Sequence, residues 1–123
     1  MSLTHRNIAV VGSRTFRNYA QLARVLEGYI ISPNDEIISG GAIGADSMAQ
    51  RWAKENGFDI SIKYPKYKVY GKPATFVRNE RIVATSDIVV AFYAKGHFQE
   101  GGTANSAEWA RKLGKPLYEY EEE

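Results

Sequence analysis

Short apolar runs alternate along this chain with segments of helical periodicity, and this alternation restricts the fold more than any other feature. The apolar runs lie at residues 8–11, 36–39, 60–64, 87–92 and 115–120. In the segments between them, apolar side chains recur every three or four residues, as on one face of a helix. These helical segments lie at 18–30, 46–56, 75–84 and 103–113. Strands and helices that alternate in this way form a mainly parallel sheet with helices on both faces.

The predicted architecture is therefore a Rossmann-like, three-layer α/β/α fold. Its five-stranded, mainly parallel sheet has the expected strand order 3-2-1-4-5. No linker or internal repeat divides the 123 residues, so we predict a single domain over residues 1–123, with a core of about 7–120 and an acidic C-terminal tail at 121–123. No apolar stretch approaches the ~20 residues of a membrane span, and no charged-then-apolar leader opens the chain. We therefore expect a cytoplasmic protein with no membrane partner.

Cysteine and histidine usage excludes several kinds of site. The chain has no cysteine and two histidines, His5 and His97. Without thiols there are no disulfides, thiolate zinc sites or thiol nucleophiles. Two histidines so far apart match no known spacing of metal ligands and give no basis for a Ser-His-Asp triad. We predict no metal and no cofactor.

The charge is unevenly distributed. The formal net charge is +2, but four of the 14 acidic residues lie among the last five positions. The remaining chain has 16 cationic and 10 acidic side chains, a net charge of +6. No acid occurs from Ile60 to Arg78, a stretch that contains Lys63, Lys66, Lys68 and Lys72. This pattern suits a phosphate-bearing ligand, and it is equally typical of a solvated basic surface.

In a sheet of this order, ligands bind beyond the carboxyl ends of the strands, at the switch point between strands 1 and 4. The loop after strand 1 contains Gly12, Ser13 and Arg14. Glycine allows a close backbone turn, while the hydroxyl and guanidinium are suited to phosphate or carboxylate. This loop lacks the G-x-G-x-x-G fingerprint, and no loop fits the P-loop pattern.

The loop after strand 2 reads S-G-G-A-I-G-A-D over residues 39–46. Three glycines in five residues cost conformational entropy, which indicates that backbone N–H groups and a helix N-terminus approach an anion. The candidate residues here are Ser39, Gly40, Gly41, Gly44 and Asp46. Asp46 either caps the following helix or contacts a ribose hydroxyl.

The loop after strand 4 leads through Gly101, Gly102 and Thr103 into a helix that contains Glu108. Bare backbone and a hydroxyl again lie at a helix N-terminus, as an anion site requires. Glu108 is a candidate general base or sugar-hydroxyl ligand, and the alternative is an exposed helical glutamate. Trp109 lies off the apolar stripe of this helix, which favours a surface position or an oligomer contact.

Together these motifs resemble the SLOG superfamily, which includes the Smf/DNA-processing protein A and LOG proteins. The similarity over residues 8–118 is greatest to its YspA-like branch. The residues that carry it are V-G-S-R at 11–14, I-S-G-G-A-I-G-A-D at 38–46, G-K-P-A at 71–74, Arg78-Asn79, Asp87, Gly102-Thr103, Ala110 and G-K-P at 114–116.

This resemblance implies a domain that binds a nucleotide or an ADP-ribose-like ligand at the carboxyl ends of the strands, and relatives that commonly pair favour a homo-oligomer. The expected ligand-binding residues are Gly12, Ser13, Arg14, Ser39, Gly40, Gly41, Gly44, Asp46, Tyr70, Lys72, Arg78, Asn79, Gly101, Gly102 and Thr103.

Two alternative functions remain open. LOG proteins cleave the N-glycosidic bond of nucleoside 5′-monophosphates with an arginine and a glutamate, roles that the resemblance gives to Arg78 and Glu108. The DNA-processing protein A branch shares a similar S-G-G-A-x-G-x-D loop and binds single-stranded DNA. Lysine and tyrosine alternate over residues 63–70, as expected of a platform on which bases stack.

Overall fold

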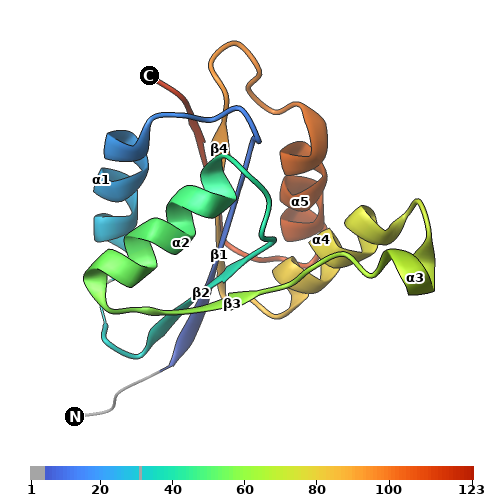
Figure 1. Cartoon of the computed structure of the whole chain (residues 1–123), viewed down its shortest axis with the longest axis horizontal. Helices are drawn as coiled ribbons and strands as arrows, with labels where there is room; N and C mark the ends of the chain where they lie inside the picture. Colours follow the sequence, from blue (N-terminus) through green and yellow to red (C-terminus); the bar gives the residue numbers. More distant parts are fainter. Residues whose placement is uncertain (1–4, 31) are drawn as a thin grey trace.

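The computed structural model describes residues 5–30 and 32–123 and confirms the predicted fold (Figure 1). Five parallel strands pair in the order β3-β2-β1-β4-β5. No helix in these described residues has the length and hydrophobicity needed to cross a bilayer. The elements are β1 (Arg6–Gly12), α1 (Tyr19–Tyr29), β2 (Asp35–Ser39), α2 (Ala45–Asn56), β3 (Asp59–Ile62), α3 (Tyr67–Tyr70), α4 (Ala74–Ala84), β4 (Ile88–Tyr93), α5 (Gly101–Lys112) and β5 (Leu117–Glu121).

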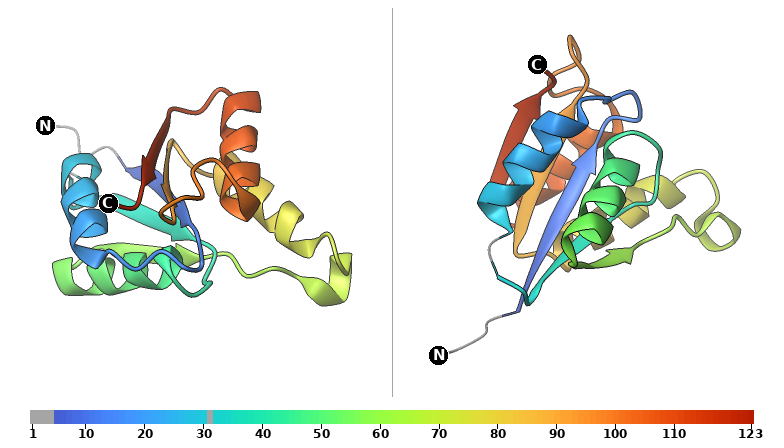
Figure 2. Two further views of the ribbon diagram at one scale, coloured as in Figure 1. Left: turned by 90° about the horizontal axis from the view of Figure 1, so that it is seen from above. Right: turned by 60° about the vertical axis from the view of Figure 1, so that its left-hand side comes forward.

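Two hydrophobic clusters hold the helices on the two faces of the sheet. Ile8 and Val10 of β1 belong to the cluster that packs α1 and α2. Ala9 and Val11 belong to the cluster that packs α4 and α5. Successive side chains of a strand point to opposite faces, so an uninterrupted apolar strand is buried on both sides. The three layers are visible in Figures 1 and 2.

The helix ends follow the sequence signals with one exception. Asn18 caps α1, because its side chain accepts a hydrogen bond from the Gln21 amide at 3.0 Å, and Gly57 ends α2 in the left-handed conformation. The prediction that Asp46 caps α2 is wrong. Gly44 is the N-cap residue, with φ of 80° and no side-chain cap, and Asp46 lies inside the first turn.

The segment between β3 and α4 contains a short helix and projects from the sheet. We call residues 63–73, which follow β3 and include α3, the arm. Both figures show the arm extending beyond the β3 edge and returning to α4. Its helix buries no side chain, so packing against the core does not explain its tyrosines.

The C-terminal acids do not form a free tail. Glu121 belongs to β5, and the side chains of Glu121 and Glu122 accept hydrogen bonds from backbone N–H groups of two loops. Trp109 is partly buried against the second cluster, so its position does not indicate an oligomer contact.

Substituting Gly12 tests how closely β1, β4 and α2 pack. A Cβ atom at Gly12 would lie 2.3 Å from the Ala45 Cβ and 2.8 Å from the Phe92 carbonyl oxygen. The backbone of β1, β4 or α2 would therefore have to move to accommodate it. We expect Gly12→Ala to lower the free energy of unfolding by about 2 kcal/mol or more. Chemical denaturation of the purified variant measures this.

Gly28→Ala is the matched control, because a Cβ atom at this helical glycine meets nothing within 4 Å. It should leave stability unchanged or raise it by up to about 1 kcal/mol, since alanine is the better helix former. Equal stabilities of the two variants would show that the junction at Gly12 yields without cost.

Candidate functional site

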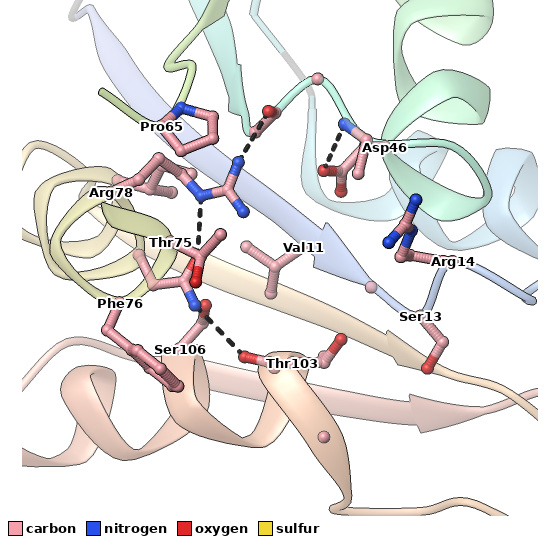
Figure 3. A pocket seen from close by; sticks show the side chains of 18 of the residues that line it. Val11, Ser13, Arg14, Asp46, Pro65, Thr75, Phe76, Arg78, Thr103 and Ser106 are labelled. Atoms are coloured by element: carbon pink, nitrogen blue, oxygen red, sulfur yellow. Dashed lines mark hydrogen bonds between the residues drawn. The ribbon is translucent and has the colours of Figure 1, made fainter. Parts of the chain in front are cut away.

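A cleft of about 1100 Å³ lies at the carboxyl ends of the strands. The loops after β1, β2 and β4 line it, as predicted, together with α4, the start of the arm and the N-terminus of α5 (Figure 3). Single small-molecule ligands usually occupy pockets of about 300–1000 Å³. The cleft is therefore large enough for more than one nucleotide.

Ser13 joins three elements beneath the cleft. Its amide donates to the Phe92 carbonyl at 2.8 Å, and its own carbonyl accepts from the Ala45 amide at 3.2 Å. Its hydroxyl oxygen accepts from the Ala94 amide at 3.0 Å. Ser13 is thus largely structural, and its O–H remains able to donate to a ligand.

Two glycines of the S-G-G-A-I-G-A-D loop permit close approaches. A Cβ atom at Gly44 would lie 2.4 Å from the carbonyl oxygens of Ser13 and Arg14. At Gly41, where φ is +75°, a Cβ atom would lie 2.7 Å from the Tyr64 ring. Gly44 therefore lets the loops after β1 and β2 meet, and Gly41 lets the Tyr64 ring lie against bare backbone.

Arg78 and Asn79 connect three walls of the cleft. Arg78 Nη1 donates to the Gly40 carbonyl at 2.8 Å, and its Nε donates to the Asn79 side chain at 2.9 Å. Asn79 donates in turn to Asn105 at 3.1 Å and to the Gly102 carbonyl at 3.5 Å. These bonds, most of them drawn in Figure 3, fix the guanidinium at the edge of the cleft.

Asp46 is almost fully buried, with 6% of its surface exposed. Its carboxylate accepts a hydrogen bond from the Ala42 amide at 3.1 Å, which holds the glycine-rich loop closed on itself. Burial raises the pKa of Asp46 to about 6, and the Ala42 amide and the positive charge of Arg78 oppose this rise only in part. Asp46 lines the cleft, but it is committed to its own loop.

Arg14 differs from Arg78 in having no partner. It lines the cleft beside the N-terminus of α2 (Figure 3) and is exposed. Among residues 5–30 and 32–123, no side chain or carbonyl pairs with its guanidinium. Gly101, Gly102 and Thr103 line the cleft at the N-terminus of α5, where unpaired backbone N–H groups favour an anion.

Aromatic side chains form the outer wall of the cleft. Tyr64, Tyr67 and Phe76 line it, yet 65%, 58% and 54% of their surfaces are exposed. Phe76 lies on α4, off the face that buries Ile82 and Val83. Contiguous exposed apolar side chains often mark a binding site, so these three rings are candidates for contact with a ligand.

Most of the predicted site residues meet at the cleft. Those that line it are Gly12, Ser13, Arg14, Gly40, Gly41, Asp46, Arg78, Asn79, Gly101, Gly102 and Thr103. Four others do not. Ser39 is buried in β2, Gly44 packs under the loop after β1, and Tyr70 and Lys72 are exposed on the arm.

Glu108, predicted to act with Arg78, is exposed further along α5 and does not line the cleft. Helical rotation explains this, because Thr103 and Ser106 occupy the face of α5 that lines the cleft and Glu108 lies two residues beyond Ser106. Tyr64 and Tyr67 belong to the stretch at residues 63–70 that was predicted as a stacking platform, although they were not among the expected ligand-binding residues, and Phe76 was in neither set. The signal for Phe76 was its place off the apolar stripe of its helix.

A family model and a relative of similar length match this chain. The first 63 residues, just over half of the chain, match the family model for DNA recombination-mediator protein A. The Gene 61 protein of Mycobacterium phage D29 is 28% identical, in an alignment that covers 94% of this chain and 96% of that protein.

Two solved structures share the fold. DNA processing protein A from Helicobacter pylori, studied for its single-stranded DNA binding mode, is 25% identical over 94% of this chain, with a TM-score of 0.69. The protein of the same name from Streptococcus pneumoniae is 21% identical over 95% of this chain, with a TM-score of 0.73. This chain spans 65% and 50% of the lengths of those two chains.

The buried carboxyl of Asp46 should make folding stability depend on pH. Its folded pKa of about 6 exceeds the ordinary value of 3.8 for an aspartate carboxyl, so the folded state binds the proton more tightly. The resulting stabilisation is fully present below about pH 4 and is lost as the pH rises through 6. At 1.36 kcal/mol per pKa unit, the loss is up to about 3 kcal/mol.

Urea unfolding of the wild type and of Asp46→Asn from pH 4 to pH 8 measures this effect. The asparagine stands in for the neutral carboxyl, so the stability of wild type relative to the variant should fall as the pH rises. If the free energies of unfolding of wild type and Asp46→Asn change with pH in parallel, the pKa of Asp46 is not raised in the folded state.

Proposed function

The chain belongs to the DNA recombination-mediator protein A family, and from this membership we propose that it binds single-stranded DNA in the cleft and along the arm. The observation that carries the proposal is the pairing of exposed aromatic rings with unpartnered cations along one continuous surface. The H. pylori relative with a single-stranded DNA binding mode supports the choice of ligand.

Bases would stack on the aromatic wall. Tyr64, Tyr67 and Phe76 offer exposed rings on one side of the cleft, and Tyr64 is held against the backbone at Gly41. A ring that is already fixed loses little conformational entropy when a base stacks on it. Since every base has a π-face, such binding tolerates any sequence.

Phosphates would lie opposite, on Arg14 and the N-terminus of α5. No residue in the described part of the chain pairs with the Arg14 guanidinium, and a guanidinium binds phosphate through two parallel hydrogen bonds. The amides at the start of α5 and the Thr103 hydroxyl supply further donors. Arg78, held by Gly40 and Asn79, contributes positive charge at a fixed position.

The arm would continue the electrostatic track beyond the cleft. Lys66, Lys68 and Lys72 are exposed on it, Lys63 lies where it leaves β3, and no acid lies between Ile60 and Arg78. Lysines interleaved with exposed tyrosines combine phosphate attraction with base stacking. A single mononucleotide in the cleft would leave this surface unused.

The finer similarity to the YspA-like branch, with a nucleotide or ADP-ribose-like ligand, competes with this proposal for the same cleft, and so does LOG-like hydrolysis. The exposed position of Glu108 outside the cleft disfavours hydrolysis. A homo-oligomer is compatible with either ligand. The binding experiments below therefore include small ligands and an assay for released base.

We expect a fluorescent oligothymidylate of about 12–20 nucleotides to bind and AMP or ADP-ribose to compete weakly. Because phosphate contacts release counterions, log K should fall linearly with log salt, by about 0.7 for each phosphate contacted on a single strand. Fluorescence anisotropy between 50 and 300 mM NaCl measures the affinity for the oligonucleotide, its competition by small ligands and its dependence on salt. Saturable binding of a mononucleotide with no affinity for the oligonucleotide would refute the proposal, and free base released from AMP would favour the hydrolase.

Two substitutions test whether Arg14 binds phosphate and whether Phe76 stacks on a base. Arg14→Ala should weaken oligonucleotide binding about tenfold and make the salt slope shallower by about 0.7. Phe76→Ala should cost about 1–3 kcal/mol of binding free energy and leave the slope unchanged. The controls are Arg24→Ala, an exposed arginine on α1, and Tyr118→Ala, a partly exposed ring on β5. Losses as large in the controls would show that the cleft is not the site.

A further inference from the structure

Strand β5 and the residue after it present three carboxylates to the β4–α5 loop, residues 94–100. The Gly96 amide donates to Glu121 at 2.8 Å, and the Lys95 amide donates to Glu122 at 3.3 Å. The Gln99 side chain donates to Glu119 at 3.3 Å. The C-terminal end of the chain lies beside this loop in Figure 1.

This loop needs support from outside, because its backbone is costly to form. Gly96 and Gly101 have φ values of 82° and 73°, and Gln99 has a φ of 61°. Gln99 is the one non-glycine residue with positive φ in the described parts of the chain. A non-glycine residue in this region costs about 1 kcal/mol or more and persists where its surroundings fix it. The carboxylates of Glu119, Glu121 and Glu122 are part of those surroundings.

Glu122 also reaches a second loop. One of its carboxylate oxygens accepts from Lys95, and the other accepts from the Arg17 amide at 2.8 Å in the β1–α1 loop, residues 13–18. Its own amide donates to the Tyr93 carbonyl at 2.8 Å, which fixes the residue at the end of β4. One carboxylate therefore connects the loop that carries Arg14 with the loop that leads into Gly101 and Thr103.

We infer that Glu122 is a positioning residue for the proposed single-stranded DNA site, holding the β1–α1 and β4–α5 loops at the spacing that phosphate binding requires. This inference rests on the proposed function. A carboxylate near a polyanion site weakens binding through repulsion, so the charge of Glu122 alone would oppose the function. Its two backbone hydrogen bonds offset that repulsion by keeping both loops ordered.

The experiment compares Glu122→Ala, Glu122→Gln and Glu123→Ala with wild type. Glu123 is the matched control, because its carboxylate pairs with the exposed Arg24 on α1 at 2.8 Å and contacts neither loop. Oligothymidylate affinity is measured by anisotropy at a temperature where circular dichroism shows every variant folded. Hydrogen exchange of the Arg17 and Lys95 amides, followed by NMR, reports directly on the two loops.

We expect Glu122→Ala to bind about tenfold more weakly than wild type and to lose exchange protection at both amides. Glu122→Gln keeps one carbonyl acceptor, so it should bind the oligonucleotide about fivefold more tightly than Glu122→Ala does. Glu123→Ala should stay within about twofold of wild type, since an exposed ion pair contributes little.

Two results would overturn the inference. If Glu122→Ala and Glu122→Gln bind equally and more tightly than wild type, the residue acts only through repulsion. If protection is lost while affinity is unchanged, the loops need no positioning. No binding by wild type would refute the proposed function and with it the effect on affinity, while amide exchange would still decide whether Glu122 joins the loops.

Discussion

The close packing of the α2 N-terminus onto the ends of β1 and β4 is the constraint on which the site depends. Gly12 leaves room for Ala45, and Gly44 leaves room for the carbonyl oxygens of Ser13 and Arg14. Ser13 then bonds to residues of both β4 and α2. These backbone contacts hold the ends of β1 and β4 and the start of α2 together at one edge of the sheet. The residues that follow in each segment therefore line one cleft. Larger residues at these glycines would separate the loops and divide the site.

Within that cleft, polar groups divide into those that hold the structure and those left for a ligand. Asp46 closes its own loop through the Ala42 amide, and Arg78 spans Gly40 and Asn79. The Asp46 carboxyl and the Arg78 guanidinium thus form hydrogen bonds mainly within the protein. Arg14 and the first amides of α5 have no such commitments. A motif such as S-G-G-A-I-G-A-D thus acts mainly by shaping the backbone, while the residues that meet a ligand lie on either side of it.

The sequence predicted the fold well, because strands and helices have different apolar patterns. The continuous apolar run Ile8–Val11 indicates a buried strand, and the spacing of Leu22 and Leu26 indicates a helix. It also placed the three loops of the cleft, since parallel strands present their carboxyl ends at one edge. It predicted Tyr64 and Tyr67 as part of a stacking platform at residues 63–70, but it predicted neither the place of Phe76 in the aromatic wall nor the role of Glu122. Both depend on how an edge strand and a chain end fold back on distant loops, and no local period encodes that geometry. Asp46 was misassigned because a helix cap and a loop-closing carboxylate have the same sequence signature.

The separation of the arm from the C-terminal glutamates gives the molecule a permanent electric dipole. The arm lies on the right of Figure 1 and the C-terminal end lies at the upper left. Lysines are exposed on the arm, and four glutamates lie among the last five residues of the chain. A polyanion approaching from solution experiences a torque that turns the arm toward it before any contact forms. For the proposed single-stranded DNA ligand, these long-range forces would favour capture at the arm first and insertion into the cleft second.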